Sequence, residues 1–179
     1  MTKSAPKDRP TELKIAIARP VHPTDRAQAE AEAATLAQDA REAGLERLAA
    51  FMEEKGPHRD FIAAVLQLSD FMRDCVRRAP QFLAVLLDRT PAERIDEILK
   101  QIAGLATQED ASEASLMRDL RLMKSEAHFL IALGDLAGAW DTATTVQHMS
   151  RLAEACVGAA TDFLLLEGHS QGKLVLPEP

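Results

Sequence analysis

Apolar side chains recur at three- and four-residue steps along most of the chain, and this spacing predicts α-helices. The longest such pattern runs from about residue 112 to residue 137. In its first half the apolar positions share one side and charged residues occupy the rest, whereas its second half is apolar almost all round. A helix that is apolar on every side must be packed on more than one side. We therefore expect this helix to be the central one of the fold.

Shorter patterns on both sides of it predict further helices, each with a start or stop signal. Thr24 or Asp25 can cap the first of them, Thr90 is followed by a proline suited to the first helical position, and Asp141 can cap the last. Ser69 either bends the third helix or starts a new one. The expected helices cover residues 24–43, 45–56, 57–79, 80–88, 90–104, 112–138 and 141–168. This is an all-α fold, a multi-helix bundle of about six to seven helices.

The first 23 residues have a different character. Four prolines interrupt them, and a proline restricts both its own backbone and that of the residue before it. We expect an irregular, proline-rich leader here, although residues 13–17 alternate between apolar and polar and can lie extended against the body.

Composition limits the classes of function. Apolar residues make up 46% of the 179 residues, aromatic residues only 4%, and tyrosine is absent. A formal charge of −7 argues against nucleic-acid binding, which needs a basic surface. We find no stretch long enough to span a membrane and no signal peptide, so we expect a cytoplasmic protein without a membrane partner. In that compartment Cys75 and Cys156 are expected to be buried, reduced thiols.

Catalytic or metal-binding patterns are scarce. The glycines are scattered and none follows a strand, so we expect no phosphate-binding loop. His128 and His148 lack an acidic neighbour at helical spacing, which argues against a metal site built from one helix. We therefore predict no catalytic residue, metal site or cofactor-binding residue in this chain.

Three residues of the central helix remain candidates for a structural or docking role: Arg121, Lys124 and Asp135. Asp135 lies in the apolar half of that helix, where an unpaired carboxylate would be costly. One interpretation is an ion pair or hydrogen bond inside the helical body. The other is a docking contact to another domain.

Two stretches resemble a known family. They are KGPHRDFIAAVL followed by LSDFMRD at residues 55–74, and LRLMK followed by IALGDLAG at residues 120–138. In this order, and with the GKLVLP ending at residues 172–177, they resemble the N-terminal helical portion of the glutamine synthetase adenylyltransferase / adenylyl-removing enzymes. The resemblance spans roughly residues 45–179.

This resemblance implies a part in the regulation of nitrogen metabolism. The family's enzymes are bifunctional nucleotidyltransferases that add adenylyl groups to glutamine synthetase and remove them. They use magnesium and ATP and respond to glutamine and to the PII signal protein. Their catalytic glycine turn and paired carboxylates are absent from these residues, so no catalytic residue is carried over, and whether the chain is itself an enzyme stays open.

The resemblance also suggests how the chain is divided. We expect a leader at residues 1–23, a helical domain at 24–168, and a linker at 169–179 towards a missing nucleotidyltransferase core. The chain would then be a truncated fragment that frames the first, deadenylylating core. The alternative is a stand-alone helical protein-interaction module.

Overall fold

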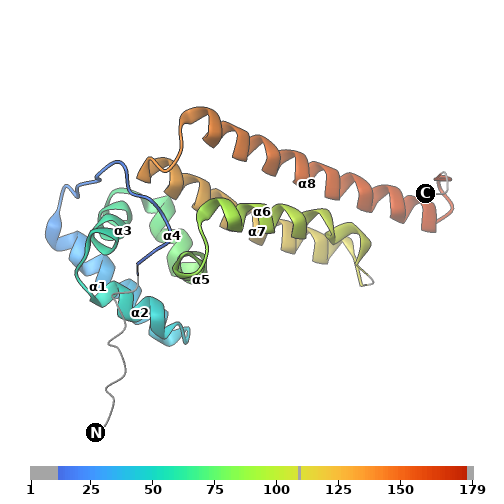
Figure 1. Ribbon diagram of the computed structural model, residues 1–179. Coiled ribbons are helices and arrows are strands. Elements are labelled where there is room, and N and C mark those ends of the chain that lie inside the picture. The colour runs from blue at the N-terminus through green and yellow to red at the C-terminus, as the bar shows by residue number, and fades with distance from the viewer. Residues whose placement is uncertain (1–11, 109, 177–179) are drawn as a thin grey trace, which may run out of the picture. The chain divides into compact units, whose positions relative to one another are not determined.

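The structure is a computed structural model, and it describes residues 12–108 and 110–176. Within these residues the backbone forms helices and no β-strand, which confirms the all-α prediction. The helices are α1 (Arg26–Glu42), α2 (Glu46–Glu53), α3 (Pro57–Leu68), α4 (Asp70–Arg78), α5 (Gln81–Ala84), η1 (Val85–Leu87), α6 (Pro91–Ala103), η2 (Leu105–Thr107), α7 (Glu113–Ala137) and α8 (Thr142–Ser170) (Figure 1).

The described part thus contains eight α-helices where about six to seven were expected. The extra one arises at Ser69, which starts a new helix. Its side-chain oxygen accepts a hydrogen bond from the backbone N–H of Met72 at 3.3 Å, which is the contact of an N-cap.

Contacts divide the chain into two compact units. The first holds α1 to α5, η1 and residues 136–139. The second holds α6, η2, α7 as far as Asp135, and α8. The division predicted from the sequence, with boundaries near residues 23 and 168, stays a prediction.

Helix α1 organises the first unit. Asp25 caps it by accepting from the backbone N–H of Gln28 at 3.0 Å, and Gly44 ends it in a left-handed conformation with φ of 72°. Its buried face is made almost entirely of alanine, which lets α2 and α3 pack closely against it. The buried residues are Ala29, Ala33, Leu36, Ala37 and Ala40.

The segment before α1, residues 12–25, contains neither helix nor strand. Leu13 and Ile15 are buried while Lys14 between them is exposed, which matches the alternation in the sequence. Backbone hydrogen bonds hold the segment at two points, from Lys14 to the carbonyl of Leu86 at 2.6 Å and from Ala18 to that of Ala137 at 2.8 Å. The first part of the predicted leader, residues 1–11, lies outside the described residues.

In the second unit, α6 and η2 pack on α8. A cluster of buried apolar side chains joins η2, α7 and α8: Leu105, Ala106, Leu116 and Phe163. Ser112 starts α7, because its side-chain oxygen accepts from the backbone N–H of Ser115 at 3.2 Å and its own N–H donates to the Ser115 hydroxyl at 2.9 Å. Residues 129–131 of α7 are all buried, so this helix is enclosed on more than one side, as its sequence predicts.

Helix α8 departs from the sequence prediction. We expected one apolar stripe including Val146, Met149, Val157 and Leu164, but these four are exposed by 57, 42, 67 and 60%. Only His148, Leu152, Ala159 and Phe163 are buried on this helix. At 3.6 residues per turn, the four exposed residues form a second line, displaced sideways from the buried one. We call this line the outer stripe of α8. The helix also continues past Gly168, the expected stop, to Ser170.

Candidate functional site

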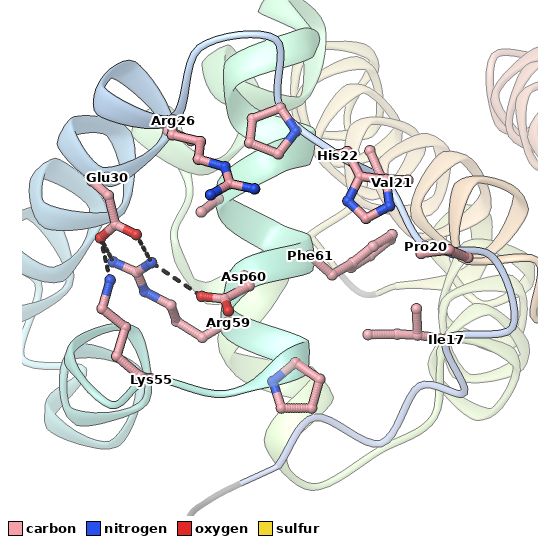
Figure 2. A pocket seen from close by; sticks show the side chains of 14 residues that line it. Ile17, Pro20, Val21, His22, Arg26, Glu30, Lys55, Arg59, Asp60 and Phe61 are labelled. Atoms are coloured by element: carbon pink, nitrogen blue, oxygen red, sulfur yellow. Dashed lines mark hydrogen bonds and ion pairs between the residues drawn. The ribbon is translucent and has the colours of Figure 1, made fainter.

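A hollow of about 650 Å³ lies in the first unit, between residues 17–23 and helices α1 and α3 (Figure 2). Its volume is within the range of small-molecule sites, roughly 300–1,000 Å³. Its lining residues are Ile17, Pro20, Val21, His22, Pro23, Arg26, Ala29, Glu30, Lys55, Pro57, Arg59, Asp60, Phe61 and Ala63. Sequence reasoning did not find this hollow.

An ion-pair cluster forms one side of the hollow. Arg59 is only 5% exposed, and its two terminal nitrogens donate to the two carboxylate oxygens of Glu30 at 2.8 and 2.7 Å. Its remaining side-chain nitrogen donates to the carbonyl of Met52 at 3.1 Å. Lys55 adds a second cation 2.6 Å from Glu30. Because bidentate arginine–carboxylate pairs are geometrically specific, Arg59 fixes α1 to α3 at this point.

These contacts determine the charge of Glu30. Hydrogen bonds from Arg59 and then from Lys55 lower its pKa from 4.5 to about 2. Glu30 is therefore ionised at neutral pH, and both its oxygens are engaged. Asp60 is held less tightly by Arg59. Its side chain is 61% exposed, and it accepts one longer hydrogen bond from Arg59, at 3.3 Å.

The opposite side of the hollow is apolar. Phe61, Ile17, Val21 and Pro20 lie together in Figure 2, away from the cluster around Glu30. Arg26 and His22 lie in the upper half of the same view, and both are exposed. Among the described residues that line the hollow there is no serine, threonine or cysteine. The described lining therefore combines an apolar wall with a few charged groups, which is typical of small-molecule sites.

The residues singled out from the sequence lie elsewhere, on α7. Arg121 and Lys124 are both exposed. Asp135 is half-buried, and its Oδ1 accepts a hydrogen bond from the hydroxyl of Thr145 at 3.1 Å. None of the three lines the hollow. A structural or docking role for them stays a prediction.

One titratable group, His148, acquires partners that the sequence did not indicate. His148 is buried, and its ring lies 4.7 Å from that of Trp140, centroid to centroid. Burial, and secondarily the charge of Arg151, lower the pKa of His148, while Asp96 from α6 acts in the opposite direction.

No group of three or more metal-binding side chains gathers within residues 12–108 and 110–176.

The two cysteines are free and half-buried rather than fully buried. Burial raises the pKa of both thiols above the ordinary value. Neither thiol therefore has the lowered pKa that marks a reactive cysteine.

Comparison with known proteins decides the family. The profile of the family described as glutamate-ammonia ligase adenylyltransferase matches residues 60–176, which is more than half of the chain. The chain belongs to this family. The resemblance inferred from the sequence is thereby confirmed.

Family members similar to this chain include three named bifunctional glutamine synthetase adenylyltransferase/adenylyl-removing enzyme. The protein of Mesorhizobium japonicum is 50% identical over 156 residues, that of Brucella suis 41% over 156, and that of Bartonella quintana 40% over 139. The matches cover 87, 87 and 78% of this chain. They cover only 16, 16 and 14% of the relatives, so the chain corresponds to a small part of these adenylyltransferases. The search of solved structures found no significant match.

None of the helices in the described part of this family member is both long enough and apolar enough to cross a membrane.

Proposed function

We propose that the chain is the N-terminal helical segment of a bifunctional glutamine synthetase adenylyltransferase/adenylyl-removing enzyme. In this role it frames the first nucleotidyltransferase core, which removes adenylyl groups, and does not catalyse by itself. The names of the relatives and the 16% of their length that the match covers support this reading.

The observation that carries the proposal is the outer stripe of α8. Val157 is 67% exposed and Leu164 60%, and both belong to a line of apolar side chains that continues along much of the helix. Isolated apolar residues are common on surfaces, but a continuous line of them is typical of an interaction site. A nucleotidyltransferase core packed on α8 would remove this line from water.

The chemistry proposed for the complete enzyme lies outside this segment. Magnesium ions and ATP would be bound by the core, since nucleotidyl transfer needs carboxylates that converge on metal ions. Glutamine synthetase would be the substrate and the PII signal protein a regulator of the whole enzyme, and the setting would be cytoplasmic. We assign no contact with any of them to a residue of this chain.

A second candidate is a stand-alone helical module that binds another protein. The same outer stripe supports it, because an exposed apolar line would serve either partner. The two candidates differ in whether the surface supports catalysis when it is joined to a core.

The experiment exchanges segments. The part of the Mesorhizobium japonicum enzyme that matches this chain is replaced by the chain, and the hybrid is assayed for ADP release from adenylylated glutamine synthetase with phosphate and magnesium. We expect the hybrid to release ADP and the chain alone to release none. Release by the chain alone, abolished by a chelator, would place catalysis within the chain and contradict the proposal.

The control is the relative with the matching segment deleted. If the segment frames the core, the deletion variant should lose activity that the hybrid retains. A deletion variant as active as the intact enzyme would favour the stand-alone module.

A further inference from the structure

The hollow in the first unit has no part in the function proposed above. We propose that it binds a small ligand carrying one carboxylate and an apolar body. The carboxylate would bind Arg26, and the apolar body would lie on the wall that contains Phe61. This inference concerns the first unit alone and does not depend on the proposed function.

Arg26 is the group that selects an anion. It is the first residue of α1, it is exposed, and no ion-pair partner for it exists among the described residues. A cation in the first turn of a helix opposes the helix dipole, so Arg26 does not stabilise α1 electrostatically. Its planar guanidinium matches the geometry of a carboxylate, to which it can donate two parallel hydrogen bonds.

The other cations of the hollow are already engaged. Arg59 and Lys55 both contact Glu30, and Arg59 also donates to a main-chain carbonyl. With Glu30 ionised, this cluster contributes three unit charges, two positive and one negative. Asp60 contributes a further negative charge. Among the described lining residues, Arg26 is then the cation whose charge is not balanced by a carboxylate.

The charges of Arg26 and Asp60 determine which ligand charge is favoured. Arg26 attracts an anion, but the exposed carboxylate of Asp60 would repel a second negative charge on it. A monoanion is therefore favoured over a dianion such as phosphate. The wall formed by Phe61, Ile17 and Val21 would shield an aliphatic or aromatic body from water.

The walls are held in place before any ligand binds. Arg59 ties α1 to α3 through Glu30, and the ring nitrogen Nε2 of His58 lies 2.9 Å from the carbonyl of Ile15, next to the apolar wall. A hollow with fixed walls loses less conformational freedom on binding, which favours affinity.

Hexanoate is a suitable probe, and the chain can be followed by NMR with isotope-labelled backbone amides. We expect millimolar hexanoate to shift the amides of residues 17–30 and 55–63 in a saturable manner. Hexanamide, which has the same apolar body without the charge, and inorganic phosphate, which has charge without the body, should each bind more weakly. Arg26→Gln should weaken hexanoate binding about fivefold, the effect of losing a solvent-exposed ion pair. Arg78→Gln, which removes an exposed arginine outside the lining, is the matched control.

Each outcome bears on the proposal. Equal affinity for hexanoate and hexanamide would show that no carboxylate is recognised, and equal affinity for phosphate would show a general response to anions. Unchanged binding by the Arg26→Gln variant, or shifts confined to other residues, would also overturn the proposal. Amide spectra of both variants that match the parent chain outside the substituted position establish that the fold is retained.

Discussion

Trp140 lies directly over Gly134, with no space between its indole ring and the helix backbone for a larger side chain. A Cβ atom at position 134 would overlap the indole, and even the ring atom Cε2 would be only 2.6 Å away. The glycine in α7 is therefore required by the tryptophan that follows the helix, rather than by backbone conformation.

This contact predicts opposite effects of one substitution at two glycines. Glycine is a poor helix former, so Gly→Ala in a helix normally adds up to about 1 kcal/mol of stability. Gly158→Ala in α8 should do so, because apart from the neighbouring backbone of its own helix nothing lies within 4 Å of the added methyl. Gly134→Ala should instead lower the free energy of unfolding by about 1–2 kcal/mol, since overpacking outweighs the propensity gain. Urea denaturation measures both, and a Gly134→Ala variant as stable as Gly158→Ala would contradict the packing.

An ion pair between α6 and α7 supplies a second prediction. Arg94 donates to both carboxylate oxygens of Glu126, at 2.7 and 2.9 Å, and Glu126 is only 8% exposed. Removing the charge of Glu126 leaves the half-buried Arg94 with Glu97 as a charge partner, a single contact at 3.2 Å to a more exposed carboxylate. Glu126→Gln should therefore lower the free energy of unfolding by about 2–3 kcal/mol. Asp119→Asn is the control, because the partner of Asp119, Arg118, is 71% exposed and such a pair contributes below about 1 kcal/mol.

The sequence predicted the features that depend on neighbouring residues. Asp25 and Asp141 cap helices as expected, because the capping carboxylate contacts an amide three residues further on. Gly44 and Gly138 end helices with positive φ for a similarly local reason.

Features that need two distant segments were missed. Glu126 looked like an ordinary charged position of α7, and only the fold brings Arg94 against it. The hollow depends on the path of residues 17–23 over α1 and α3, which has no periodic pattern. The outer stripe of α8 shows a further limit, since periodicity reveals apolar positions but not how many sides of a helix are covered.

The pair of Trp140 and His148 predicts a measurable pH dependence. Burial lowers the pKa of His148 below its ordinary 6.5, so the folded chain favours the neutral ring. The contribution of neutral His148 to the free energy of unfolding is complete above pH 6.5. It is lost as the pH falls further, because the histidine of the unfolded chain is protonated at a higher pH than that of the folded chain. Trp140 is the single tryptophan, and its ring lies 4.7 Å from that of His148. Its fluorescence should therefore report the protonation.

We expect the emission of Trp140 to fall with decreasing pH, with a midpoint below 6.5, as the charged imidazole quenches the neighbouring indole. His148→Gln should remove this step while leaving the emission at neutral pH close to that of the parent chain. A midpoint at or above 6.5 would mean that the charge of Asp96 raises the pKa of His148 by at least as much as burial lowers it.

The last prediction concerns the outer stripe of α8 and separates a docking surface from a core position. Val157 is 67% exposed, so Val157→Lys should change the free energy of unfolding of the chain by no more than about 0.5 kcal/mol. Phe163→Ala, on the buried side of the same helix, should lower it by about 3–5 kcal/mol, because it opens a cavity in the cluster with Leu105 and Leu116. In the hybrid with the Mesorhizobium japonicum enzyme, however, Val157→Lys would place a charge in an apolar interface, and ADP release should fall even though the segment is still folded. Full activity of this hybrid variant would show that the outer stripe is not covered by the catalytic core.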